Sequence, residues 1–248
     1  MRWAVYLAVA GCSFDLPAAA VGDGRGADGT PANDSNGTAD SPLPPGPPVI
    51  DTTQTATGGN VSTLSWTHSA SGANRLVVVG ISWGLSSASI ASLTYGQMPM
   101  TQIGTRTNTT KDINMALWML VAPPTGAQTI RVAFSGQVGD NAIGGSVSFT
   151  NVNQTTPTGT FSSSVGGGPG ISVTASSGPD ELVIDTVAAD SNPSGMTLGS
   201  GQTQLWKLGP GRWGLASVEP GAASVTMSWT ETGSSDDWAQ GAVSIKGG

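Results

Sequence analysis

Asn74-Arg75-Leu76-Val77-Val78-Val79-Gly80-Ile81 and Asp180-Glu181-Leu182-Val183-Ile184-Asp185-Thr186-Val187 are two stretches that read alike. Each begins with a polar pair and continues with Leu and β-branched residues, the composition of a strand in the middle of a sheet. The segments that follow them also match in order. The chain therefore carries one structural unit twice.

Four pairs of segments define this duplication: 76–78 with 182–184, 100–103 with 202–205, 126–134 with 221–229, and 145–149 with 241–245. The offset between the copies falls from 106 residues (76 to 182) to 96 residues (145 to 241). Conserved order with shrinking spacing is what duplication followed by loop trimming leaves. We place the two repeats at about 60–152 and 158–247.

The duplicated region has the pattern of an all-β protein. In the segment 130–134, Ile130, Val132 and Phe134 fall on every second position, as do Leu64 and Trp66 earlier in the chain. Half-buried strands of antiparallel sheets alternate in this way. No window shows a sustained 3.6-residue apolar repeat with capping residues, so we expect no helices.

Two architectures fit a duplicated β region over residues 49–248. In the first, the copies are two halves of one jelly-roll-like antiparallel sandwich; in the second, they are two tandem immunoglobulin-like sandwiches. We favour the first, because the segment 115–121 is apolar on both faces and needs cover on both sides. The junction 151–170 also contains strand-like residues and is not a clean linker.

Charge and residue counts exclude several kinds of site. The formal net charge is −7, and the few basic residues are scattered, so there is no footprint for nucleic acid. Cys12 is the sole cysteine, which excludes an intrachain disulfide. His68 is the sole histidine, and we interpret it as a structural imidazole rather than a zinc ligand.

The N-terminus reads as an export signal. A basic start and a short apolar run end in Val9-Ala10-Gly11-Cys12. This run is too short to span a bilayer, and it resembles the lipobox of bacterial lipoproteins. The resemblance implies cleavage of the signal peptide 1–11 and lipidation of Cys12. With Ser13 next, it also implies a destination at the outer membrane, on its cell-surface or its periplasmic face.

The segment from Cys12 to residue 48 is predicted to be a disordered linker between this anchor and the domain. It is rich in Gly, Asp, Ser, Thr and Pro and has almost nothing to bury. An EF-hand calcium loop at 23–29 is not favoured, because Arg25 stands where a ligand is needed.

Residues of about 50–247 resemble a widespread group of exported bacterial β-sandwich domains, mostly without an assigned function. The shared traits are structural: 74–80, Leu93-Thr94-Tyr95-Gly96, Leu117-Trp118, the turn 153–157, and 225–229. The resemblance implies a fold and an extracellular setting rather than an activity.

Four tryptophans sit beside Gly or loop residues: Trp83, Trp206, Trp213 and Trp238. Exposed indoles are flat surfaces on which sugar rings stack, so these residues are candidates for glycan binding. The alternative is that they cap the ends of the core.

Two carboxylates are the candidates for hydrolytic chemistry. Asp185 interrupts an apolar strand where the first copy has Val79, and Glu219 stands where the first copy has Ala122. A glycosidase needs such a pair, but a structural pair would look the same in sequence. We expect no cofactor; weak calcium candidates are the loop oxygens of Asp140-Asn141, 190–192 and Asp236-Asp237.

These observations predict a non-enzymatic lipoprotein whose tethered sandwich recognises an extracellular partner, either a glycan or a surface protein in adhesion. The alternatives are a structural component of the envelope without a small ligand, and a polysaccharide hydrolase or lyase.

Overall fold

The computed structural model describes residues 46–84, 86–190, 195–209, 211–232 and 236–248. They belong to one compact unit, Leu43–Gly248. The predicted signal peptide, Cys12 and the linker up to residue 45 lie outside the described residues. All described elements are strands, and every strand pair is antiparallel, which confirms the predicted all-β class.

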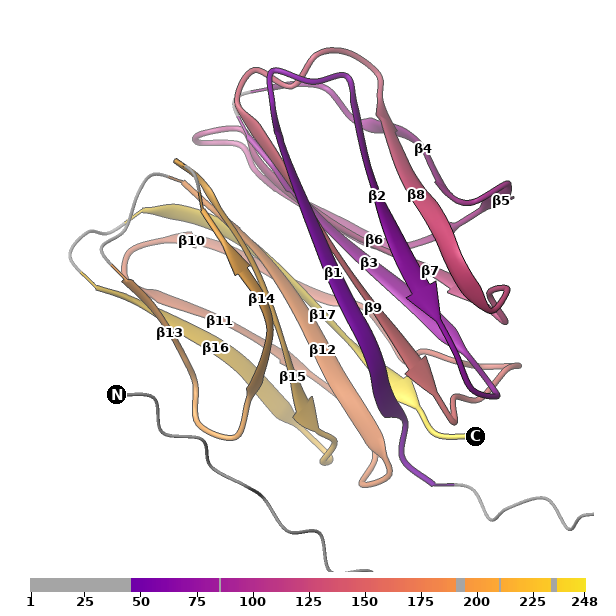
Figure 1. Ribbon diagram of the computed structural model, residues 1–248. Helices are drawn as coiled ribbons and strands as arrows, with labels where there is room; N and C mark the ends of the chain where they lie inside the picture. The colour runs from indigo at the N-terminus through magenta and orange to yellow at the C-terminus, as the bar shows by residue number, and fades with distance from the viewer. Residues whose placement is uncertain (1–45, 85, 191–194, 210, 233–235) are drawn as a thin grey trace, which may run out of the picture. The chain divides into compact units, whose positions relative to one another are not determined.

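The first copy builds two sheets (Figure 1). The five-stranded one, called here the first inner sheet, has the order β1 (Val49–Gly59), β9 (Asn141–Thr150), β3 (Leu76–Trp83), β7 (Ile113–Val121) and β6 (Thr101–Asn108). The four-stranded one, the first outer sheet, has the order β2 (Thr63–Ala70), β8 (Gly126–Phe134), β4 (Ile90–Tyr95) and β5 (Met98–Pro99).

The second copy repeats this plan. The second inner sheet has the order β10 (Ser162–Gly167), β17 (Asp237–Lys246), β12 (Glu181–Ala189), β15 (Trp213–Pro220) and β14 (Thr203–Leu208). The second outer sheet has the order β11 (Gly170–Ala175), β16 (Val225–Thr232) and β13 (Gly195–Leu198).

The strand registers confirm the predicted duplication. In the first copy Gly80 pairs with Gly145 across β3 and β9, and in the second copy Thr186 pairs with Gly241 across β12 and β17. These are the positions that the sequence offsets make equivalent. The two copies thus share strand order and register.

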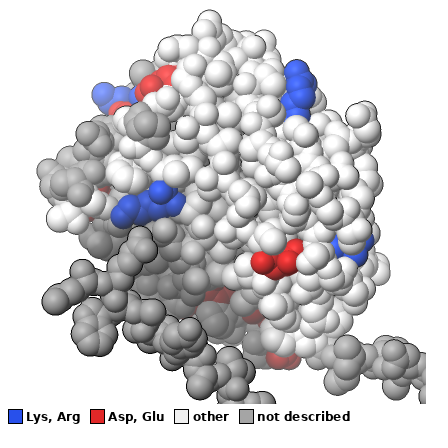
Figure 2. All heavy atoms as spheres, viewed as in Figure 1, with Lys and Arg blue, Asp and Glu red and all other residues white. Residues whose placement is uncertain are grey.

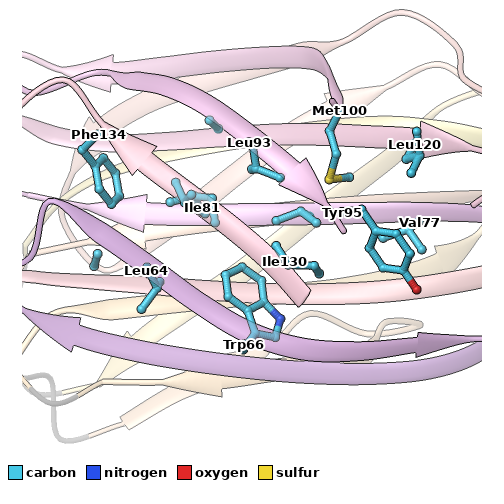
Figure 3. Close-up of a cluster of buried hydrophobic side chains, with 14 of the residues drawn as sticks. Leu64, Trp66, Val77, Ile81, Leu93, Tyr95, Met100, Leu120, Ile130 and Phe134 are labelled. Carbon is cyan, nitrogen blue, oxygen red and sulfur yellow. The ribbon is translucent and has the colours of Figure 1, made fainter. Parts of the chain in front are cut away.

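Each inner sheet is covered on both faces, as the apolar segment around β7 requires. All eight residues of β3 are buried. Val77 and Val79 pack in the core shared with the first outer sheet, whereas Leu76 and Val78 pack in the core shared with the second copy. Figure 3 shows the first of these cores, where Trp66, Tyr95 and Phe134 lie among aliphatic side chains. Alternate side chains of β3 therefore pack into two different cores, one on each face of the sheet.

The two inner sheets pack face to face through reciprocal contacts. β6 contacts β10, and their counterparts β14 and β1 also contact each other; β7 with β17 and β15 with β9 form a second such pair. This is the pattern of an isologous interface, related by an approximate twofold axis. As in the predicted pair of tandem sandwiches, each copy supplies both of its own sheets. As in the predicted single body made of two halves, both copies form one compact unit.

Aromatic side chains fill glycine-lined spaces at this interface. Trp206 lies against Gly80 and Gly145, and Phe161 lies against Gly104 and Gly241. A Cβ on any of these four glycines would overlap the ring. Glycine within a strand often marks such a close approach.

An ion pair also joins the copies. Arg212, just before β15, lies with its Nε 2.7 Å from Asp140 Oδ2 of the first copy and its Nη1 2.8 Å from Asp190 Oδ1 of the second. The arginine side chain is 8% exposed. Asp140 and Asp190, two of the weak calcium candidates, therefore both face a guanidinium.

Candidate ligand groove

A groove of about 360 Å³ lies at the edge of the first sandwich. Its lining residues come from the end of β3 and the segment leading to β4, from β6, and from β7. The side chains that argue for a ligand are Trp83, Gln102, Thr105, Thr107, Asn114 and Trp118. The volume lies within the range of about 300–1,000 Å³ that is usual for small-molecule sites.

Strand alternation places these residues. On β7, Met115 and Leu117 point into the core between the inner sheets, whereas Ala116 and Trp118 belong to the core of the first sandwich. Gln102 pairs with Trp118, and Thr107 pairs with Asn114, on the neighbouring edge strand β6. The edge of the inner sheet thus presents polar side chains next to an indole.

Hydrogen bonds fix the wall of the groove. Thr107 Oγ1 donates to Asn114 Oδ1 at 2.8 Å, and Asn114 Nδ2 donates to the carbonyl of Asp112 at 2.8 Å. Thr105 Oγ1 donates to the carbonyl of Met115 at 2.8 Å. These side chains are held in place before any ligand arrives, which reduces the entropy lost on binding.

The two indoles of the groove differ in their hydrogen bonding. Trp83 Nε1 donates to the carbonyl of Ala88 at 2.8 Å. Trp118 is half-buried, and its buried Nε1 has no hydrogen-bond partner among the described residues. A buried donor without a partner costs free energy, and because this atom has almost no accessible surface, the groove meets the indole through its other atoms.

The groove has little charge. Asp112 is its one acidic residue, and no Lys or Arg is found among the described residues that line it. Figure 2 shows that charged side chains are also few and scattered over the face that it displays. This surface favours hydrogen bonding and stacking over ionic attraction.

The four predicted tryptophans do not gather in one groove. Trp206 is 4% exposed in the core between the inner sheets, and Trp238 is 6% exposed in the core of the second sandwich. Their expected exposure as flat platforms is wrong, because neighbouring glycines create interior space for both rings. Trp83 is buried but lines the groove, and Trp213 is half-buried beside Lys207.

Asp185 is a fully buried carboxylate. Oδ1 accepts hydrogen bonds from the backbone N and the Oγ of Ser217 at 2.6 and 2.7 Å. Oδ2 accepts hydrogen bonds from Trp229 Nε1 at 2.9 Å and Gln240 Nε2 at 2.8 Å. Burial raises the pKa of Asp185, and these hydrogen bonds act in the opposite direction. Four protein donors occupy the carboxylate and leave no place for a substrate.

Glu219 lies two residues from Ser217 on β15 and is half-buried. Burial raises the pKa of Glu219, and its buried Oε2 has no hydrogen-bond partner among the described residues. Neither Glu219 nor Asp185 lines the groove. The two candidate carboxylates therefore do not share a site with the indoles.

His68 is enclosed in a polar network of the first copy. Its Nδ1 lies 2.9 Å from Ser146 Oγ, and its Nε2 lies 3.3 Å from Thr52 Oγ1. Burial lowers the pKa of His68 to about 4, and the charge of Asp51 raises it by less. The imidazole is neutral and structural at pH 7, as the sequence suggested. Among the described residues, no three His, Cys, Asp or Glu side chains come together as a metal site.

Two other hollows are less suited to a ligand. One, of about 310 Å³, is lined by residues such as Gly46, Asp180 and Lys246 and has no aromatic side chain. The other, of about 290 Å³, lies between the edge strands β1 and β14, where Trp206 is already buried. The groove alone among these three combines indoles with several hydroxyl and amide groups.

Comparison with known proteins adds no candidate. No protein-family model matches the chain, and neither a curated protein nor a solved structure matches it. Among the described residues, no helix is long and apolar enough to cross a membrane.

Sequence reasoning missed most of the groove. Gln102, Thr105, Asn114 and Trp118 were not among the predicted site residues, because each is ordinary in an edge or core strand. A signal was present in the difference between the copies: the positions equivalent to Thr105 and Asn114 carry Lys207 and Trp213.

Proposed function

We propose that this chain is an exported, non-enzymatic recognition protein whose first sandwich binds a glycan in the groove. The single observation that carries the proposal is the groove itself, in which the half-buried indole of Trp118 adjoins prearranged hydroxyl and amide side chains. Sugars are recognised by this combination: an aromatic face stacks on C–H groups, and polar side chains bond the hydroxyls.

The proposal includes the membrane anchor. Lipidation at Cys12, followed by a linker of about 36 residues up to residue 48, would hold the sandwich away from an outer membrane. Several acyl chains make such a tether effectively permanent. A glycan or another surface molecule would then be within reach.

Two rival functions make different predictions. A structural envelope component would bind no glycan. A polysaccharide hydrolase or lyase would turn over a substrate, but the burial of Asp185 and its four donors support a structural role for that carboxylate. The proposal therefore favours binding without turnover.

A glycan array with the full chain tests the proposal. Trp118→Ala is expected to weaken binding by about tenfold or more, because an aromatic anchor is lost. Trp213→Ala is the matched control, since Trp213 is also half-buried and its Nε1 also has no partner among the described residues. It is expected to bind as the wild type does.

The other outcomes are equally informative. Absence of binding by the wild type would favour the structural role. Loss of binding in Trp213→Ala alone would move the site to the second copy. Product release from a bound polysaccharide would overturn the non-enzymatic assignment.

A further inference from the structure

The two copies differ at the place where the first one forms its groove. β6 and β7 correspond to β14 and β15, and the pairing of Thr105 with Ala116 corresponds to that of Lys207 with Leu215. By the same register, Trp213 stands where the first copy has Asn114. The two copies therefore allow a comparison of the same fold with different side chains at equivalent edge positions.

In the second copy, two large side chains meet at the equivalent edge of the sandwich. Lys207 Nζ donates to the carbonyl of Met196 at 2.7 Å and lies 5.7 Å from the ring centre of Trp213. Met196 belongs to β13, the counterpart of β4. The lysine therefore spans from the inner sheet to the outer sheet, and its ammonium is held by a carbonyl and an aromatic face.

In the first copy the same edge remains open. Thr105 is too short to reach β4, and its hydroxyl bonds the carbonyl of Met115 on its own sheet. Asn114 is tied to Thr107 and Asp112 rather than extended across the edge. In the other copy, the larger side chains Lys207 and Trp213 stand at the positions equivalent to Thr105 and Asn114.

We infer that the groove is a site for an uncharged glycan and that Thr105 and Asn114 keep it open, an inference that rests on the proposed function. The lining offers the carboxylate of Asp112, hydroxyl and amide groups, and the indole of Trp118. A uronate or a sulfated sugar would bring a second negative charge with no lining cation to offset it. The groove therefore selects neutral chains over acidic ones.

The experiment introduces the Lys and Trp of the second copy at the equivalent positions 105 and 114 of the first copy. The double variant Thr105→Lys/Asn114→Trp is expected to lose glycan binding by about tenfold or more, and its thermal midpoint is measured alongside to establish that it folds. The single variant Thr105→Lys, at an exposed position, is expected to weaken binding in the same direction. Thr129→Lys, an exposed threonine on β8, is the matched control and should bind normally.

The probes are soluble neutral glucans, mannans and xylans, each compared with a uronate-bearing polymer of similar length. Binding of the neutral polymers at least about tenfold more tightly than the uronates supports the inference. Preference for uronates would overturn the ligand class. Unchanged binding in folded variants would overturn the role of Thr105 and Asn114, whereas the groove itself, and with it the proposed function, is tested by Trp118→Ala. If the double variant does not fold, Thr105→Lys decides. Absence of any wild-type binding would instead remove the proposed function.

Discussion

The indole of Trp206 lies directly over Gly145, and no space remains between them for a side chain on residue 145. The two residues belong to different copies and meet in the core between the inner sheets. The join between the copies is therefore a close-packed interior.

We expect Gly145→Ala to destabilise the protein by about 1–3 kcal/mol, because the new methyl group overpacks this interior. Thermal or denaturant unfolding measures the change. Gly136→Ala is the matched control: no atom lies within 4 Å of a Cβ placed there, so its stability should stay close to that of the wild type. Equal behaviour of the two variants would contradict the close packing.

Arg212 joins the copies by a different force. Arg212→Ala leaves the carboxylates of Asp140 and Asp190 without this partner, and both are partly exposed. We expect a loss of about 1–3 kcal/mol in the free energy of unfolding, less than for a fully buried pair. Arg131→Ala removes an exposed arginine and should cost within about 0.5 kcal/mol. A similar cost for both would show that the ion pair adds little.

His68 makes stability depend on pH in a definite direction. Its pKa is about 4 in the folded protein, below the usual 6.5. Between these values the unfolded chain binds more protons, so stability falls as the pH falls from about 6.5 to about 4, by up to about 3 kcal/mol. Urea unfolding at pH 7 and pH 4.5 should show a smaller pH effect in His68→Gln. Identical pH dependence would contradict a buried neutral imidazole.

Asp185 is predicted to act in folding rather than in catalysis. Asp185→Asn turns an amide N–H₂ toward groups that are themselves donors, so we expect a loss of about 2–4 kcal/mol in stability. Asp180→Asn, at an exposed aspartate, is the control and should be neutral. Unaltered stability together with loss of a polysaccharide-degrading activity would make Asp185 catalytic.

Cys12 is predicted to carry the lipid anchor. Cys12→Ser should move the protein from the membrane fraction to the soluble fraction, because the acyl chains are absent. Detergent phase partitioning measures the effect, and Ser13→Ala is the neighbouring control. If Cys12→Ser remains in the membrane fraction, the anchor lies elsewhere or another contact holds the protein.

Strand identity was readable from the sequence wherever burial alternates. Leu64 and Trp66 alternate with polar residues because one face of β2 meets the core. The duplication was also readable, because residues 76–78 and 182–184 hold the same place in equivalent strands. The packing of the two inner sheets against each other could not be predicted from the sequence. A strand that is apolar on both faces predicts cover on both sides, but not which sheet provides it.

The tryptophans show why the site was harder to predict than the fold. Gly or loop residues beside an indole in sequence predict an exposed ring, whereas Gly80 and Gly145, strand residues far from Trp206 in sequence, make room for this ring in the core. Local sequence does not show which distant side chain enters such a space. The groove likewise depends on the small size of Thr105 and Asn114. The sequence around these residues does not show that a larger side chain is missing there.

Gly80 and Thr186 are equivalent positions, yet they touch each other: a Cβ on residue 80 would come within 2.8 Å of Thr186 Oγ1. In a homodimer of identical subunits, the residue on the axis must be the same on both sides, so two threonines would collide and two glycines would leave a void. Covalent fusion of the copies removes that restriction. One copy can then keep a glycine at this position while the other carries a threonine. The two copies differ in the same way at the sandwich edge, where the first has Thr105 and Asn114 and the second has Lys207 and Trp213.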